Sequence, residues 1–187
     1  SYHLPLIGGD TIALPDGAAR VFGMTAIGRA AAKVPDRAGG RSGDALWLVG
    51  TVGDAAAGLA QLHADAKATG PLVDIFRRPI PQLSAGQALA PYAHAMMDVS
   101  DGLLLDAKRM AEASGRAVTL DLDQLPLSSA FVAERGGDLV ARLFAATGGD
   151  DYALLAAFPS GLNPASFSLP KGTRVSRIGA LTDGEPG

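Results

Sequence analysis

The sequence predicts an α/β (α+β) fold in which helices pack on a mixed sheet. Short apolar runs that are typical of strands alternate along the chain with longer stretches of helical periodicity, and this alternation indicates layers of helices on a sheet. Hydrophobic residues make up 48% of the 187 residues and charged residues 19%, which is the composition of a globular protein with a sizeable core.

Composition also limits the function classes. The formal net charge of −3 argues against nucleic acid as a partner, because phosphate binding usually leaves a basic surface. The chain has no cysteine, which excludes disulfides, thiolate zinc sites and a cysteine nucleophile and agrees with a reducing cytoplasm. No apolar run approaches the roughly 20 residues that span a bilayer, so we expect no membrane partner.

The N-terminal part predicts a strand-like run and a tight glycine turn within residues 1–11. A hinge is expected near residues 28–43, which are rich in Ala, Gly, Arg and Pro. We therefore expect residues 1–28 to end an N-terminal domain and residues 29–187 to form a C-terminal α/β domain. Both ends of the sequence stop close to an element, which indicates a longer parent protein.

The next elements follow from local patterns. The apolar run at 45–50 predicts a buried strand, and the alanine-rich stretch at 55–68 predicts a helix with Asp54 as its N-cap. The two prolines at 77–83 prevent an ordinary helix in that connection. Residues 84–95 predict a short helix that is interrupted near its proline.

A longer helix is predicted from about 101 to 114, where apolar residues form two adjacent stripes. Gly115 is expected to end it as a C′ residue. The remaining elements are a strand at 117–122, a loop at 123–129, a helix at 137–147, a strand at 151–158, a loop at 159–172 and a strand at 174–181.

The strand-to-helix junction "DVSDG" carries Asp98 and Asp101 with Ser100 between them. Two interpretations are open from these residues alone. Asp and Ser are preferred N-cap residues, so the side chains can simply cap the following helix. Two carboxylates around one turn also suit Mg²⁺, which prefers oxygen ligands and is often shared with a polyphosphate that Ser100 would bond.

Two further glycine–acid motifs have the same ambiguity. "GGDT" places Asp10 beside glycines that let a backbone approach a ligand closely, and "TGGDDYAL" joins two glycines to two acids before a strand. Both are also ordinary turn compositions. "GTVGD" lacks the Gly-Lys-Ser/Thr ending of a phosphate loop, and no nucleophile elbow is present.

Together these segments resemble the thiamine-monophosphate kinases, a family of the aminoimidazole-ribonucleotide-synthetase-like ATP-binding superfamily. The resemblance extends over nearly the whole chain, in the order of the family's motifs. It is carried by "LIGGDT", "DRAGGRSGDALWLVGTVGDAAAGL", "RRPIPQL", "AMMDVSDGLLLDAKRMAEASG", "DLDQLPLS", "GGDDYALL" and "RIGAL".

The resemblance implies ATP-dependent phosphorylation of thiamine monophosphate to thiamine diphosphate, with several Mg²⁺ ions, in a homodimer. Residues 1–28 would then end a nucleotide-binding, metal-binding and dimerisation domain. Carried over by position, the implied metal ligands are Asp10, Asp98 and Asp101, the implied ATP contacts are Gly9, Asp10, Arg37 and Ser100, and the implied substrate contact is Asp150.

The chemistry of such a site agrees with these residue types. An acceptor that is itself a phosphate is already ionised, so direct in-line transfer needs positioning and charge neutralisation more than a strong base.

The sequence departs from the family in "GGDDYAL", where the family usually has "GGEDYEL", so Asp150 is one methylene shorter and Ala153 replaces an acid. The alternatives are another ATP-using enzyme of the superfamily and a non-catalytic nucleotide-binding relative.

Overall fold

The structure is a computed structural model that describes residues 4–30 and 34–187. The chain divides into two compact units, Ser1–Ala31 and Ala32–Gly187. Residues 1–3 of the predicted first strand and residues 31–33 of the predicted hinge lie outside the described residues. The described residues of the first unit form no helix or strand, so the strand-like run expected before "GGDT" is wrong there. The assignment of residues 1–28 to an N-terminal domain stays a prediction.

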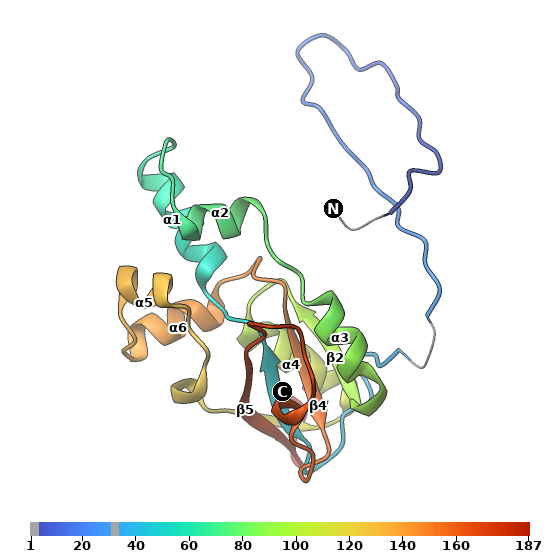
Figure 1. Ribbon diagram of the computed structural model, residues 1–187, viewed down its shortest axis with the longest axis vertical. Coiled ribbons are helices and arrows are strands. Elements are labelled where there is room, and N and C mark those ends of the chain that lie inside the picture. The colour runs from blue at the N-terminus through green and yellow to red at the C-terminus, as the bar shows by residue number, and fades with distance from the viewer. Residues whose placement is uncertain (1–3, 31–33) are drawn as a thin grey trace. The chain divides into compact units, whose positions relative to one another are not determined.

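The second unit contains a five-stranded sheet with the strand order β2-β4-β1-β5-β3 (Figure 1). The predicted arrangement of helices on a sheet is confirmed, but all four strand pairings are antiparallel, so the sheet is not mixed. β1 and β2 do run in the same direction, but β4 lies between them and is antiparallel to both. The strands are β1 (Ala45–Val49), β2 (Ala95–Val99), β3 (Ala117–Leu120), β4 (Ala153–Phe158) and β5 (Val175–Thr182).

Six α-helices accompany the sheet in the described part of the chain. The predicted helix before Gly115 is α4, and Gly115 ends it in the left-handed conformation with φ of 63°, as expected. Two seven-residue helices, α2 and α5, were not predicted, because two turns are too short to show a helical period. The helices are α1 (Asp54–Ala64), α2 (Pro71–Arg77), α3 (Leu83–Leu89), α4 (Leu103–Ser114), α5 (Ser129–Arg135) and α6 (Leu139–Thr147).

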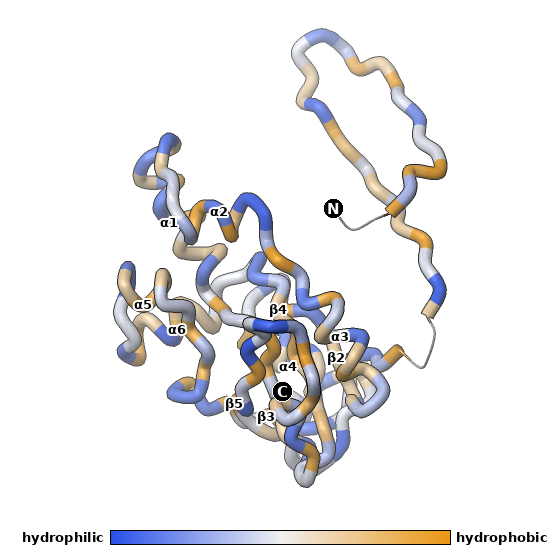
Figure 2. Tube along the Cα trace, in the orientation of Figure 1, coloured by the Kyte–Doolittle hydropathy of each residue, from blue (hydrophilic) through white to orange (hydrophobic). Residues whose placement is uncertain are grey.

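The core has two layers, one on each face of the sheet. Leu46 and Leu48 of β1 pack in the larger cluster, which also contains residues of α4 and α6. Trp47 and Val49 alternate with them and belong to the smaller cluster, which contains residues of α3. Because both faces are covered, β1 is apolar without interruption. Figure 2 shows hydrophobic residues on the strands and hydrophilic residues at the tip between α1 and α2.

None of the helices in the described part of the chain combines the length and the hydropathy that a membrane crossing requires.

Candidate functional site

Three loops meet at one edge of the sheet because of the strand directions. β4 is antiparallel to both of its neighbours, and its first residues pair with Val49 at the end of β1 and Val99 at the end of β2. The loops that follow β1 and β2 therefore lie beside the loop that precedes β4. We call residues 50–54, 98–102 and 148–152 the three-loop edge.

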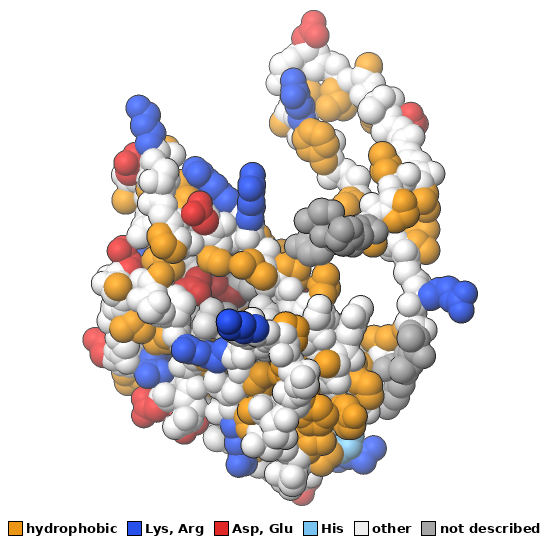
Figure 3. Space-filling model, in the orientation of Figure 1, with side chains coloured by type: hydrophobic (Ala, Val, Ile, Leu, Met, Phe, Trp, Pro, Cys, Tyr) orange, Lys and Arg blue, Asp and Glu red, His pale blue; other side chains and the backbone are white. Residues whose placement is uncertain are grey.

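The motifs "DVSDG" and "GGDDY" are in direct contact at this edge. The Asp150 amide donates a hydrogen bond to the Ser100 carbonyl oxygen at 2.9 Å, and the Tyr152 amide donates to the Val99 carbonyl oxygen at 3.0 Å. The structure thus brings together four of the residues that the sequence singled out: Asp98, Ser100, Asp101 and Asp150. Figure 3 shows acidic side chains gathered below helices α1 and α2, with basic side chains near them.

Asp98 and Asp101 are not helix caps. The N-cap residue of α4 is Gly102, and no side chain makes a capping hydrogen bond there. Asp98 is exposed at the end of β2. The Asp101 side chain is about half exposed, at 52%, and forms an ion pair with Arg109. The capping alternative from the sequence is therefore wrong for both aspartates, and their carboxylates face solvent at the three-loop edge.

Asp106 holds the "DVSDG" turn from inside. Its carboxylate is buried, and one oxygen accepts hydrogen bonds from the Ser100 and Asp101 amides, both at 3.0 Å. The other oxygen accepts from Arg109 Nη1 at 3.0 Å. The hydrogen bonds that Arg109 donates to Asp101 and, to a smaller extent, to Asp106 raise the pKa of Arg109 above its ordinary value, so the guanidinium stays cationic. Asp106 was not predicted as a site residue, because its only signal in the sequence is an acid on the apolar side of the helix.

Replacing Asp106 by Ala is expected to lower the free energy of unfolding by about 2–4 kcal/mol, since two amides and a guanidinium would lose their buried acceptor. Urea denaturation measures this loss. The control is Asp138→Ala, which removes the N-cap of α6 and should cost about 0.5–2 kcal/mol. A smaller loss for Asp106→Ala than for the control would show that the carboxylate does not hold the turn.

Asp151 links the third loop to the start of α1. Its buried carboxylate accepts hydrogen bonds from the Gly53 amide at 2.6 Å and the Ala55 amide at 3.0 Å. Asp54, the predicted N-cap of this helix, is instead its first residue, and Gly53 is the N-cap. The Asp54 carboxylate accepts from the Thr51 and Ser128 hydroxyls. The carboxylate that accepts hydrogen bonds from the first amides of α1 thus belongs to a residue that is far away in the sequence.

Burial raises the pKa of Asp151 from 3.8 to about 7, and the nearby Asp54 and Asp150 charges add to the shift. The hydrogen bonds from the Ala55 and Gly53 amides oppose it. The folded protein then holds a proton that the unfolded chain releases near pH 4. The protonated Asp151 side chain therefore contributes to the free energy of unfolding at low pH, and this contribution is lost as the pH rises toward 7.

The quantity to compare is the free energy of unfolding of the wild type minus that of Asp151→Asn. We expect this difference to decrease between about pH 4 and pH 7 and to be flat above that range. Urea denaturation at a series of pH values measures it. Subtracting the variant removes the contributions of groups that titrate equally in both proteins. A difference that stays flat over the same range would mean that the two amides keep the pKa of the carboxylate at or below its ordinary value.

One predicted residue of the second unit is not at this edge. Arg37 lies at the far end of α4, where its carbonyl oxygen accepts a hydrogen bond from the Ser114 hydroxyl. The preceding residue, Asp36, accepts from the Met96 amide near the start of β2. Gly9 and Asp10 are exposed residues of the first unit, and an Asp10 carboxylate oxygen accepts from the Thr11 amide.

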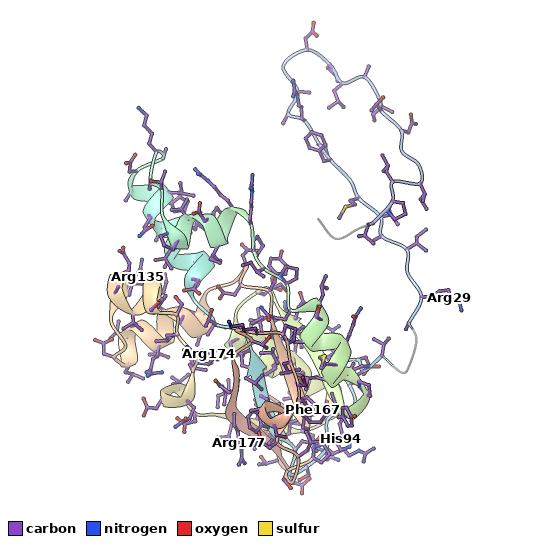
Figure 4. All side chains as sticks on the ribbon, viewed as in Figure 1. Arg29, His94, Arg135, Phe167, Arg174 and Arg177 are labelled. Atoms are coloured by element: carbon purple, nitrogen blue, oxygen red, sulfur yellow. The ribbon has the colours of Figure 1, made fainter. Side chains whose placement is uncertain are left out.

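Arg174 adds a basic side chain that the sequence analysis did not single out. It precedes β5, whose first residue pairs with Val49, so it lies close to the three-loop edge. Its carbonyl oxygen accepts from the Gly50 amide, and its guanidinium donates to the Leu127 carbonyl oxygen at 2.7 Å. Figure 4 shows Arg174 near one end of the sheet and His94, which precedes β2, near the other.

The donor set at the edge fits Mg²⁺. Within residues 4–30 and 34–187, no three His, Asp or Glu side chains gather into a group that could hold a metal by itself. Mg²⁺ does not need such a group, because one or two carboxylates commonly hold it together with water and substrate phosphates. Asp98 and Asp101 provide two accessible carboxylates of this kind.

Comparisons with known proteins agree with the motifs. Residues 41–185 match the family described as AIR synthase related protein, C-terminal domain. The thiamine-monophosphate kinase of Caulobacter vibrioides is 35% identical over 193 residues, which cover 98% of this chain and 54% of that protein.

Two solved structures are similar to this chain. The thiamine-monophosphate kinase from Stenotrophomonas maltophilia K279a has a TM-score of 0.74 at 35% identity, covering 81% of this chain and 51% of the other. AaThiL complexed with AMPPCP and TMP has a TM-score of 0.70 at 32% identity, covering 81% and 49%. The chain spans about half the length of these three proteins.

The resemblance to thiamine-monophosphate kinases, first drawn from the motifs, is confirmed by these similarities in sequence and fold. The family match extends over most of the second unit, including the whole sheet and the three-loop edge. The chain therefore belongs to the AIR synthase related protein family, whose C-terminal domain it contains.

Proposed function

We propose that this chain is part of an ATP-dependent kinase that phosphorylates thiamine monophosphate to thiamine diphosphate. The observation that carries the proposal is the contact between "DVSDG" and "GGDDY" through the Asp150 amide and the Ser100 carbonyl oxygen. It puts the candidate ATP and metal residues beside the candidate substrate residue. The similarity to AaThiL complexed with AMPPCP and TMP supports the same pair of ligands.

In the proposed reaction, a phosphate oxygen of thiamine monophosphate attacks the γ-phosphorus of ATP in line. The bond from that phosphorus to the oxygen shared with the β-phosphate breaks, and its electron pair leaves with ADP. The acceptor is ionised already, so no side chain has to remove a proton. Ser100 would donate a hydrogen bond to a phosphate oxygen, and the exposed Asp150 carboxylate would contact the cationic thiamine group.

Asp98 and Asp101 would hold Mg²⁺. The family resemblance implies a metal and nucleotide role for Asp10 and a nucleotide role for Gly9, both in the first unit. Mg²⁺ would neutralise negative charge on the phosphate oxygens. The proposal includes a homodimer, as the family resemblance implies, and a cytoplasmic location, with which the absence of cysteine agrees. Arg37 would contact ATP, as the family resemblance implies.

The test is to incubate the full-length protein with ATP, Mg²⁺ and thiamine monophosphate and to separate the products by chromatography. A reaction without thiamine monophosphate is the control. We expect thiamine diphosphate and ADP in equal amounts, with no radiolabel left on the protein from labelled ATP. Mg²⁺-dependent ATP binding without product would instead favour another acceptor or a non-catalytic relative. A stable phosphoenzyme would contradict direct transfer.

A further inference from the structure

The loop before β4 has an unusual backbone. Among the described residues, Asp150 and Tyr152 are the non-glycine residues with positive φ, at 66° and 51°. A left-handed conformation costs a side-chain-bearing residue about 1–2 kcal/mol. Such strain persists only where the surroundings fix it, and it is concentrated at functional sites. The two strained residues flank Asp151.

Four hydrogen bonds hold this loop. The amides of Asp150 and Tyr152 bond to the end of β2, as described above. The Asp151 carboxylate bonds to the two amides at the start of α1. Asp151 is 8% exposed, whereas Asp150 is exposed and Tyr152 is 37% exposed. The middle side chain thus points inward, and its two neighbours lie at the surface.

We propose that Asp151 is a positioning residue: its bonds to Gly53 and Ala55 keep the strained loop in the conformation that presents Asp150 to the substrate. This inference rests on the proposed function, because it assumes that Asp150 contacts thiamine monophosphate. It goes further by separating the acid that touches the substrate from the acid that fixes the loop. A simple helix cap would affect stability alone and would leave ligand binding unchanged.

A double-mutant cycle tests the positioning role in the full-length protein. The dissociation constants of thiamine monophosphate and of a non-hydrolysable ATP analogue are measured by calorimetry for wild type, Asp150→Ala, Asp151→Ala and the double variant. Asp151→Ala should weaken thiamine monophosphate binding about tenfold or more and change analogue binding less than about twofold. The double variant should bind no more weakly than Asp150→Ala, because both changes remove one contact. Independent, additive losses would overturn the proposal.

Asp138→Ala is the matched control, because it removes a capping carboxylate at the other end of α6 from the loop. It should leave both dissociation constants unchanged. If Asp151→Ala does not fold, Asp151→Asn replaces it in the cycle, since the amide keeps one acceptor oxygen. The Asn variant should then show a smaller loss in the same direction, and equal binding to wild type would overturn the proposal.

Amide hydrogen exchange of the ligand-free protein separates this inference from the proposed function. The Asp150 and Tyr152 amides should exchange faster in Asp151→Ala than in wild type or Asp138→Ala. Unchanged exchange would overturn the anchoring whatever the substrate is. A third outcome is that the amides exchange faster in Asp151→Ala but the wild-type protein does not bind thiamine monophosphate. Asp151 would then still fix the loop, but its role in substrate binding and the proposed function would both be overturned.

Discussion

Asp98→Ala is expected to reduce formation of thiamine diphosphate by at least about 100-fold, because a metal that neutralises transition-state charge is worth several kcal/mol. Asp98 is exposed and makes no capping bond to α4. The free energy of unfolding should therefore change by less than about 0.5 kcal/mol. The activity is measured with saturating ATP and thiamine monophosphate, and the stability by urea denaturation.

A readout besides turnover is the affinity for Mg²⁺. Titration with Mg²⁺ in the presence of a non-hydrolysable ATP analogue should show weaker metal binding for Asp98→Ala than for wild type. Asp74→Asn is the control, since it neutralises an exposed aspartate that lies on α2, outside the three-loop edge. Full activity together with a clear loss of stability would contradict the metal role and would give Asp98 a structural one.

The main elements of the fold were predictable, whereas the strand directions were not. The apolar runs at β1, β2 and β4 and the periodic stretch at α4 are local signals, and the structure has an element at each of them. Strand direction depends on which strands become neighbours. The insertion of β4 between β1 and β2 is a long-range event that no local pattern records.

The same division applies to the candidate site. The residue types in "DVSDG" and "GGDDY" were visible in the sequence, and the two motifs do meet. The residues that hold them, Asp106 and Asp151, were missed. Both act through backbone amides, five or six residues away for Asp106 and 96 or 98 residues away for Asp151. A pattern of side chains cannot show which amides a buried carboxylate will reach.

Gly149→Ala is expected to disable the site by separating the two motifs. A Cβ at position 149 would overlap the Ser100 carbonyl oxygen, which also accepts the hydrogen bond from the Asp150 amide. Both partners of the clash are backbone, so the loops have to move apart. Displacing reacting groups by about 1 Å can cost about 100-fold in rate, and we expect a loss of kcat/KM of that size. The strain should also lower the free energy of unfolding by about 1–3 kcal/mol.

Gly137→Ala is the matched control, because a Cβ there meets no atom within 4 Å and the change should be nearly neutral. The affinities for the two ligands then distinguish Gly149→Ala from Asp151→Ala. Moving the loops apart disturbs Ser100 and Asp150 together, so both the ATP analogue and thiamine monophosphate should bind more weakly. Asp151→Ala should affect thiamine monophosphate alone. If Gly149→Ala binds both ligands normally, the contact between the two motifs does not assemble the site. The hydrogen bond from the Asp150 amide to the Ser100 carbonyl oxygen would then no longer support the proposed function.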